Sequence, residues 1–305
     1  MNAETLSDIA TWITNQGLAG ATETAMLDGF CTRLVAAGVP VARGLLIIDT
    51  LHPIYEGRAV RWRTGEAPEL IEYGSSAEGE RAESWRRSPF YRLFETGGEM
   101  LRRRLSPAVL AEFPGLASEI EAGLTDYVCF CTHFGAEGTI GEADCIYSHW
   151  ISAGDGGFDD ADIETIRRLL PHLTLAMKCA SLGRITETLA ETYLGRDAAR
   201  LVLSGRIGRG AADRIDAVVW FSDLHGFTRI TDTSAPEQII PLLNDYAEVV
   251  VTTVHEHGGD VLKLIGDGVL AIFRADDRKA ACLAAIKAAK LAKRRVWELN
   301  GRRAA

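Results

Sequence analysis

The amino-acid sequence predicts an α+β protein in which a helical segment separates two mixed domains. Short apolar runs rich in β-branched residues, typical of strands, alternate with segments whose apolar residues recur at helical spacing. A chain of 305 residues also has room for two domains. We expect a first domain at residues 1–157, a helical linker with a hinge at 158–213, and a second domain at 214–305.

Composition narrows the class of protein. The net charge of −9 argues against a general nucleic-acid binder, because neutralising phosphates requires a basic surface. No apolar run approaches the roughly 20 residues of a membrane span, and the first residues lack the basic and apolar regions of a signal peptide. Six cysteines at irregular spacings do not suggest a disulfide framework. We therefore expect a cytoplasmic protein without nucleic-acid or membrane partners.

The first domain is predicted to be a strand meander flanked by helices. Helices are expected at residues 5–16, 21–37, 88–95 and 107–122, and strands at 44–50, 57–63, 126–134 and 143–151. The polar stretch 65–87 is expected to be loop with a short strand at 70–73. This order of elements resembles a GAF-like sensory domain, which implies an unknown small-molecule ligand.

The linker begins with acidic residues at a helix start, Asp159 to Asp162, followed by apolar residues at helical spacing. Pro171 is expected to kink this helix. An apolar stripe then continues from Leu182 to about Leu203. The pattern predicts either two packing helices or a parallel dimerising helix. A hinge rich in glycine and arginine is expected at residues 204–213.

The second domain opens with an apolar strand at 217–221, which places Asp223 at its end, and Gly226 follows at a predicted helix start. Residues 234–237 predict a capping box for the next helix. Strands at 261–265 and 269–273 flank a turn that holds Asp267, and a helix is expected at 278–298.

Asp223 and Asp267 form the candidate site. Each aspartate alone is as well explained by a helix cap or a turn. Together, two carboxylates at strand ends beside the free N–H groups of a helix start suit a pair of Mg²⁺ ions on a triphosphate.

The residues FSDLHGFT at 221–228, followed by HGGDVLKLIGD at 257–267, are similar to the catalytic domain of class III nucleotidyl (adenylate/guanylate) cyclases. The spacing between the two aspartates also matches that family. The resemblance implies a ferredoxin-like βααβ-β-α fold. It also implies that Asp223 and Asp267 are catalytic and hold two Mg²⁺ or Mn²⁺ ions, with the carbonyl of Leu224 as a further ligand.

The resemblance implies a substrate as well. The amides of Gly226, Phe227 and Thr228 would cradle phosphates, and Lys263 stands where adenylate cyclases carry an adenine-selecting lysine. The implied reaction converts ATP into 3′,5′-cyclic AMP and pyrophosphate through attack of the 3′-oxygen on the α-phosphorus. In the implied homodimer, Asp223 and Asp267 of one subunit face Lys263 of the other.

The chain departs from the family pattern at its C-terminal end. The family continues beyond the helix ending near Glu298, with a second base-selecting residue and with an asparagine and an arginine that act on the ribose and the transition state. Losing one such contact typically costs about 10²–10³ in rate, so we expect the catalytic domain to be truncated and this chain to be inactive. The alternative is a non-catalytic regulator that binds nucleotide or dimerises. A diguanylate cyclase, suggested by Gly258-Gly-Asp260, is disfavoured because Val261-Leu262 follows.

A second set of residues resembles a zinc site. Cys129, Cys131, His133, Cys145 and His149 are all metal-ligand types. Three of them share one face of a single predicted strand and no CxxC pair is present, so packing or surface roles are favoured.

Other residue types are expected to be structural. The run Arg102 to Arg104 is expected to be a solvated face. Trp62, Trp85 and Trp150 are expected to pack in the core.

Overall fold

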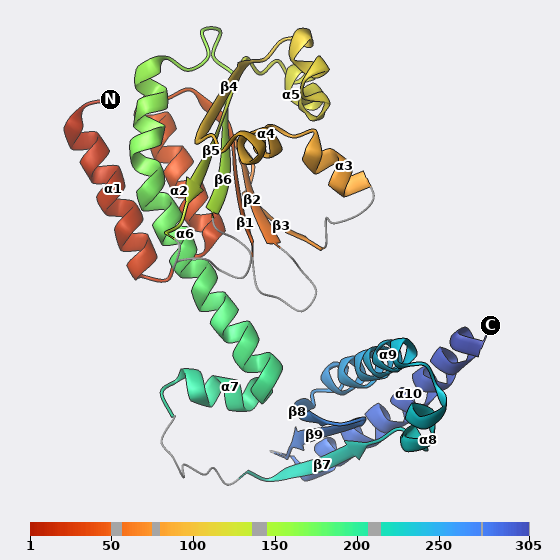
Figure 1. The fold of residues 1–305 in the computed structure, drawn as a ribbon. Coiled ribbons are helices and arrows are strands. Elements are labelled where there is room, and N and C mark those ends of the chain that lie inside the picture. Colours follow the sequence, from red (N-terminus) through yellow and green to blue (C-terminus); the bar gives the residue numbers. More distant parts are fainter. Residues whose placement is uncertain (50–56, 75–79, 136–144, 207–214, 276, 305) are drawn as a thin grey trace. The chain divides into compact units, whose positions relative to one another are not determined.

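The computed structural model describes residues 1–49, 57–74, 80–135, 145–206, 215–275 and 277–304. It divides into two compact units, Met1–Ile185 (unit 1) and Thr186–Ala305 (unit 2) (Figure 1). Both units combine helices with antiparallel strands, so the α+β prediction is confirmed. Among the described residues, no helix is long and apolar enough to cross a membrane.

Unit 1 is built on one antiparallel sheet. Its strands are β1 (Val41–Asp49), β2 (Gly57–Arg63), β3 (Glu69–Tyr73), β4 (Met100–Arg104), β5 (Asp126–His133) and β6 (Cys145–Ser152), in the order β3-β2-β1-β6-β5-β4. The predicted strands agree within a few residues, although positions 50, 143 and 144 lie outside the described residues. The result is the sheet flanked by helices that the GAF-like resemblance implied.

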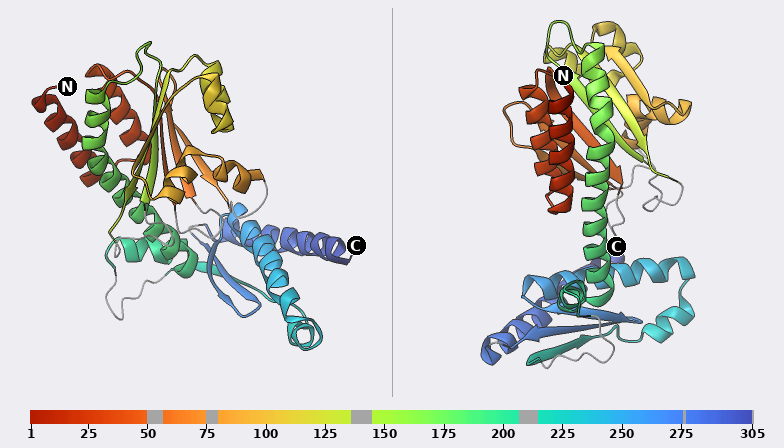
Figure 2. Two further views of the ribbon diagram at one scale, coloured as in Figure 1. Left: turned by 45° about the horizontal axis from the view of Figure 1, so that its top comes forward. Right: turned by 90° about the vertical axis from the view of Figure 1, so that its left-hand side faces the viewer.

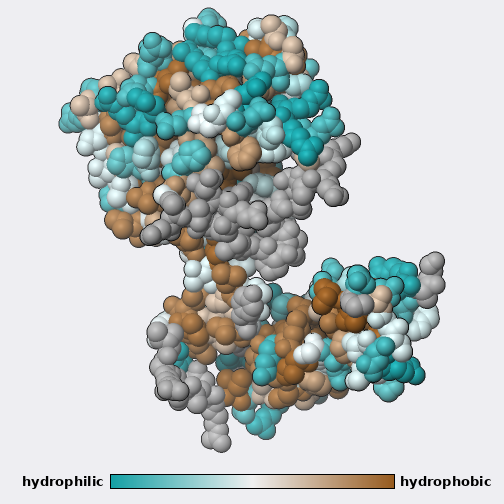
Figure 3. Space-filling model, in the orientation of Figure 1, coloured by the Kyte–Doolittle hydropathy of each residue, from teal (hydrophilic) through white to brown (hydrophobic). Residues whose placement is uncertain are grey.

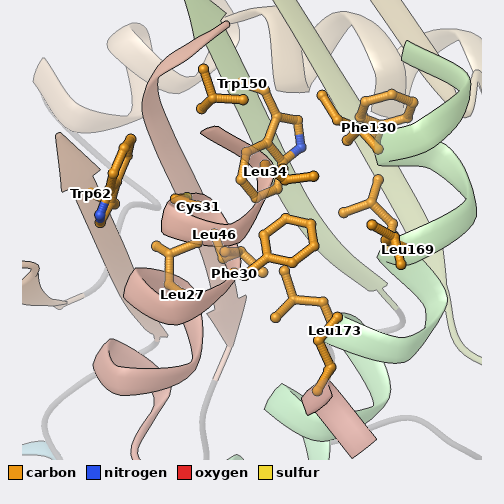
Figure 4. Packing of buried hydrophobic residues seen from close by; sticks show 14 of the residues in the cluster. Leu27, Phe30, Cys31, Leu34, Leu46, Trp62, Phe130, Trp150, Leu169 and Leu173 are labelled. Atoms are coloured by element: carbon orange, nitrogen blue, oxygen red, sulfur yellow. The ribbon is translucent and has the colours of Figure 1, made fainter. Parts of the chain in front are cut away.

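One face of this sheet is covered by α1 (Ala3–Leu18), α2 (Glu23–Ala36) and α6 (Asp160–Leu194) (Figure 2). Asn2 and Thr22 cap the first two helices, because their side chains accept hydrogen bonds from first-turn amides. Phe30 and Trp150 meet edge to face in the core, with ring centroids 5.3 Å apart (Figure 4). Trp62 and Trp150 are both buried, as predicted.

The other face carries α3 (Glu80–Arg86), α4 (Pro89–Thr96) and α5 (Ala117–Glu121) (Figure 1). The single helix predicted at 107–122 is wrong. Two 3₁₀ turns, Pro107–Ala111 and Pro114–Leu116, precede α5. The cause is Pro114, which disfavours a helical conformation at the residue before it. The helix α3 lies in the stretch predicted to be loop.

The prediction of a solvated face at Arg102 to Arg104 is confirmed for the exposed Arg104 but is wrong for Arg102. These residues form most of β4, and Arg102 donates to the fully buried Asp126 across 2.7 Å. Arg104 lies 3.5 Å from the same carboxylate, which also accepts a hydrogen bond from the amide of Phe158. Asp126 therefore ties β4 and β5 to the start of α6.

The linker helix α6 runs unbroken through Pro171 to Leu194. The break falls instead at Gly195, whose φ of 80° lies in the left-handed region, and α7 (Arg196–Leu203) follows. A side chain on Gly195 would come within 2.4 Å of the carbonyl oxygen of Val261. Most of the predicted hinge, residues 207–214, lies outside the described residues.

Unit 2 contains β7 (Ala217–Ser222), α8 (Phe227–Thr233), α9 (Pro236–Glu256), β8 (Asp260–Ile265), β9 (Gly268–Arg274) and α10 (Arg278–Ala304). This is the βααβ-β-α order that the resemblance implied, and the sheet order is β7-β9-β8. Helices α9 and α10 form a core with one face of the sheet. The predicted capping box is wrong, because Ala235 is the N-cap of α9 and makes no side-chain hydrogen bond.

Candidate functional site

The end of β7 positions Asp223. Ser222, the last strand residue, forms a 2.7 Å hydrogen bond between its Oγ and the hydroxyl of Tyr246 on α9. Tyr246 is buried, and this burial raises the pKa of its hydroxyl, which stays protonated at neutral pH. This hydrogen bond fixes the end of β7 to α9 at the residue that precedes Asp223.

The turn between β8 and β9 positions Asp267. Gly266 has a φ of 62°, which a tight turn requires, and Ile265 pairs with Gly268 across the turn. A side chain on Gly268 would meet the ring of Phe221 at 2.8 Å. The absence of a side chain at Gly268 therefore allows this turn to lie against the end of β7.

The two aspartates meet at this point. The amide of Leu224 donates to Oδ2 of Asp267 over 3.3 Å. A hydrogen bond that protonated Asp223 donates to the carboxylate of Asp267 raises the pKa of Asp223, and desolvation and the neighbouring negative charge act in the same direction. Two carboxyl groups this close together also suit a divalent cation, because a cation at that position neutralises both charges. The donor set therefore fits the predicted metal site.

The segment after Asp223 forms a turn into α8. Gly226 is the N-cap residue, and its φ of 75° favours glycine. The amide of Phe227 donates to the carbonyl of Leu224 over 3.3 Å. The amide of Phe227 must break this hydrogen bond before it can donate to a phosphate. The carbonyl oxygen of Leu224 has a second lone pair, which can bind a cation while the hydrogen bond remains. The first amides of a helix have no partner within the helix, so Thr228 is placed to donate to an anion.

Lys263 lies on β8 and is exposed. The strand registers place both Lys263 and Phe221 opposite Leu270 of the central strand β9. Side chains directly opposite one another lie on the same face of a sheet. Lys263 therefore lies on the face opposite the α9 and α10 core, with two strand spacings, about 10 Å, between it and Phe221.

The structure thus brings Asp223, Leu224 and Asp267 together and places Lys263 farther along the same sheet. His225 is an exposed turn residue, as expected. Sequence reasoning missed the parts played by Tyr246 and Gly268. The run Gly266-Asp267-Gly268 was the available signal for a tight turn that packs closely against another strand.

Comparison with known proteins supports the resemblance for this part of the chain. Residues 211–295 match the family described as the adenylate and guanylate cyclase catalytic domain. Over 100 residues the chain is 37% identical to the uncharacterized protein Rv1319c of Mycobacterium tuberculosis, covering 32% of this chain and 18% of that protein. Over 72 residues it is 33% identical to adenylate cyclase 1 of Rhizobium meliloti, covering 24% of this chain and 11% of the relative. The resemblance to class III cyclases is confirmed for this segment.

These matches are partial. The chain spans less than a fifth of the length of both relatives. A solved bacterial light-regulated adenylyl cyclase is 13% identical, with a TM-score of 0.32 over 62% of this chain and 63% of its own. The phycoerythrobilin-bound GAF domain from a cyanobacterial phytochrome is 11% identical, with a TM-score of 0.38 over 60% of this chain and 98% of its own. Neither structural likeness defines a function for this chain.

Proposed function

We propose that unit 2 is the nucleotide-binding module of an adenylate cyclase-type signalling protein that converts ATP into 3′,5′-cyclic AMP and pyrophosphate. The contact between Asp223 and Asp267 is the observation that carries this proposal. Chain folding brings the two carboxyl groups together within the segment that matches the cyclase catalytic domain. An ATP-dependent reaction also agrees with the cytoplasmic location expected from the sequence.

The proposed roles follow from the groups that each residue offers. Asp223, Asp267 and the carbonyl of Leu224 would hold Mg²⁺ or Mn²⁺, two ions per site. These cations supply charge that acidifies the ribose 3′-hydroxyl and stabilises the leaving pyrophosphate. The amides of Gly226 and Thr228, with that of Phe227 once its turn bond opens, donate to phosphate oxygens. Lys263 donates to an adenine ring nitrogen.

We infer that the complete site forms between two copies of unit 2. Lys263 is separated from the strand that carries Asp223 by the central strand β9. In a homodimer, the lysine of one subunit would instead face the aspartates of the other. Residues 1–157 would then be a sensory domain for a small molecule, and residues 158–213 would transmit its signal.

The first test measures binding and turnover separately. The chain is titrated with ATP in the presence of Mg²⁺ or Mn²⁺, and cyclic AMP is quantified by chromatography. We expect cation-dependent ATP binding that weakens at least tenfold in Asp223→Ala and Asp267→Ala, since each removes a charged ligand of the cations. Asp232→Ala, at an exposed position on α8, is the matched control and keeps the parental affinity.

The outcomes separate the two functions considered for this chain. Cyclic AMP formation that requires both aspartates supports the adenylate cyclase. Cation-dependent ATP binding without product supports the nucleotide-binding regulator. If ATP binding is indifferent to the cation and to both aspartates, the proposed site is wrong.

A further inference from the structure

Thiol and imidazole side chains gather at one end of the β5–β6 ladder in unit 1. Cys131, His133 and Cys145 each offer one ligand atom, and these atoms all lie within 4.8 Å of one another. Sγ of Cys131 and Nε2 of His133 are 3.4 Å apart. Both cysteines are buried, whereas His133 is exposed. The cluster is therefore open to solvent on its imidazole side.

The backbone fixes the positions of these three residues. In the antiparallel ladder His133 lies directly opposite Cys145, so their side chains share one face of the sheet. Cys131 precedes His133 by two residues on the same strand and shares that face. The amide of Cys131 also donates to the carbonyl of Glu99 over 2.9 Å, which holds the end of β5 against the preceding segment.

The spacing of the ligand atoms matches a tetrahedral metal. A zinc ion lies about 2.3 Å from a thiolate sulfur and about 2.0–2.1 Å from an imidazole nitrogen, which puts these two atoms about 3.5 Å apart. The Cys131–His133 pair already has this separation at 3.4 Å. The ligand atoms of the other two pairs lie at most 4.8 Å apart. Two sulfurs bound to one zinc ion lie about 3.8 Å apart, which is at most about 1 Å less. Small side-chain rotations close that difference.

The same register argues against a disulfide between the two cysteines. Cys131 lies opposite Tyr147, so Cys131 and Cys145 are diagonal neighbours across the ladder. Diagonal positions have Cβ atoms about 7 Å apart, whereas a disulfide requires about 3.5–4.5 Å. A metal ion between the two sulfurs spans the longer distance without moving the strands.

The other two members of the predicted five-residue zinc set have different surroundings. Cys129 is fully buried and lies opposite His149 in the ladder, and it does not belong to the group of ligand atoms that lie close together. The ring of His149 stacks on Phe90 at 5.8 Å and lies 5.2 Å from the ring of Tyr127. The structure therefore divides the set, and among the described residues only Cys131, His133 and Cys145 bring their ligand atoms close together.

We propose that Cys131, His133 and Cys145 form a zinc site in unit 1. Two thiolates and an imidazole favour thiophilic cations over Mg²⁺ and Ca²⁺, and the two thiolate charges balance the ion. The described residues supply three donors, so water or an exogenous ligand would occupy the fourth position of a tetrahedral ion. This site is separate from Asp223 and Asp267 and does not depend on the cyclase proposal.

Cobalt substitution tests the site directly. The full chain is reduced, freed of metal with a chelator and titrated with Co²⁺ as a spectroscopic probe. We expect one Co²⁺ per chain, a sulfur-to-cobalt charge-transfer band, and loss of that band when Zn²⁺ displaces cobalt. Zn²⁺ should also raise the melting temperature of the chain, because folding brings the three ligands together and the folded state therefore binds the ion more tightly than the unfolded chain does.

Ligand variants and matched controls decide the assignment. Cys131→Ser, Cys145→Ser and His133→Gln should each weaken Co²⁺ binding by at least about 10- to 100-fold. Cys179→Ser and Cys282→Ser, at exposed positions outside the cluster, should bind as the parent does. Circular dichroism of each metal-free variant shows whether the variant folds. If the variants of the buried cysteines do not fold, His133→Gln still tests the site, because His133 is exposed.

Two results would overturn the proposal. One is a reduced, folded parent that takes up neither Co²⁺ nor Zn²⁺. The other is a His133→Gln variant that retains both the charge-transfer band and the parental affinity. A chain that loses two hydrogen masses on mild oxidation at Cys131 and Cys145, and never binds metal, would indicate a disulfide pair instead.

Discussion

The sheets of the two units differ in how completely helices cover them. The six-stranded sheet of unit 1 has a hydrophobic core on each face. Among the residues that the structure describes, the three-stranded sheet of unit 2 has one such core, and on the opposite face Val219 and Phe221 are 68% and 56% exposed. Hydrophobic residues are visible on the surface of unit 2 around β8 and β9 (Figure 3). Apolar side chains left uncovered in this way mark surfaces that bind something else.

The uncovered face is also the face that carries Lys263. The predicted chemistry of unit 2 therefore lies where folding alone does not exclude water. The buried carboxylate of Asp126 in unit 1 is instead satisfied by partners within the same unit. This difference agrees with the proposal that a second copy of unit 2 completes the site.

The largest expected effect comes from placing the same charge on the two sheets. Leu46→Glu puts a carboxylate into the buried core of unit 1, and we expect the unit to unfold because the residues directly opposite, Val60 and Ser148, carry no positive charge. Val219→Glu puts it on the exposed face of unit 2, where stability should change by no more than about 0.5 kcal/mol. Thermal unfolding followed by calorimetry distinguishes these results. Equal losses of stability in the two variants would show that the face of β7 is covered in solution.

A mixing experiment examines how the site in unit 2 is completed. Asp223→Ala and Lys263→Ala chains should each bind ATP weakly in the presence of Mg²⁺. If aspartates and lysine of opposite subunits form one site, mixing the two variants restores one intact site per mixed dimer, or about a quarter of the parental number of high-affinity ATP sites. Mixing Asp223→Ala with Asp267→Ala is the control and should restore nothing, because both changes fall on the same side of the site. The formation of mixed dimers would be verified by mass spectrometry. If these dimers do not recover high-affinity ATP binding, the whole site lies within one subunit.

Much of the architecture was predictable because local patterns specified it. The strand predicted at 57–63 is β2, and helices predicted at 5–16 and 88–95 are α1 and α4 within a few residues. The approach of Asp223 to Asp267 was also predicted, from two motifs whose spacing matches a family. In these cases the determining residues are close in sequence or form a joint motif.

Contacts between residues far apart in the chain limit what the sequence can predict. Arg102 and Asp126 are 24 residues apart, and their ion pair turns a basic run into part of a strand. The zinc candidate depends on the β5–β6 register, which opposes His133 to Cys145 and separates Cys129 from the cluster. Spacing along one strand cannot supply that information. Asp260 likewise accepts a hydrogen bond from the amide of Arg196, 64 residues away, at the start of α7.

The smallest expected effect is the contribution of one histidine, His149, to the pH dependence of the stability of unit 1. Burial is the largest cause that lowers the pKa of His149 to about 3, and the positive charges of Arg61 and Arg43 act in the same direction. The folded state therefore keeps His149 neutral, whereas the unfolded chain takes up a proton below a pH of about 6.5. This contribution to stability is fully present above that pH and declines as the pH falls toward 3, by at most about 1.4 kcal/mol per pH unit.

A pair of histidine variants isolates this contribution from the acid sensitivity of the carboxylates. His149→Phe keeps an aromatic ring against Phe90 and Tyr127 and removes the titrating group. His172→Gln removes an exposed histidine of α6. Between pH 7.5 and 4.5 the melting temperature should fall less steeply in His149→Phe than in the parent, and His172→Gln should follow the parent. Identical pH dependence in all three chains would mean that His149 takes up a proton in the folded state as well. Water would then reach the core beneath α3, α4 and α5 more readily than its covering helices suggest.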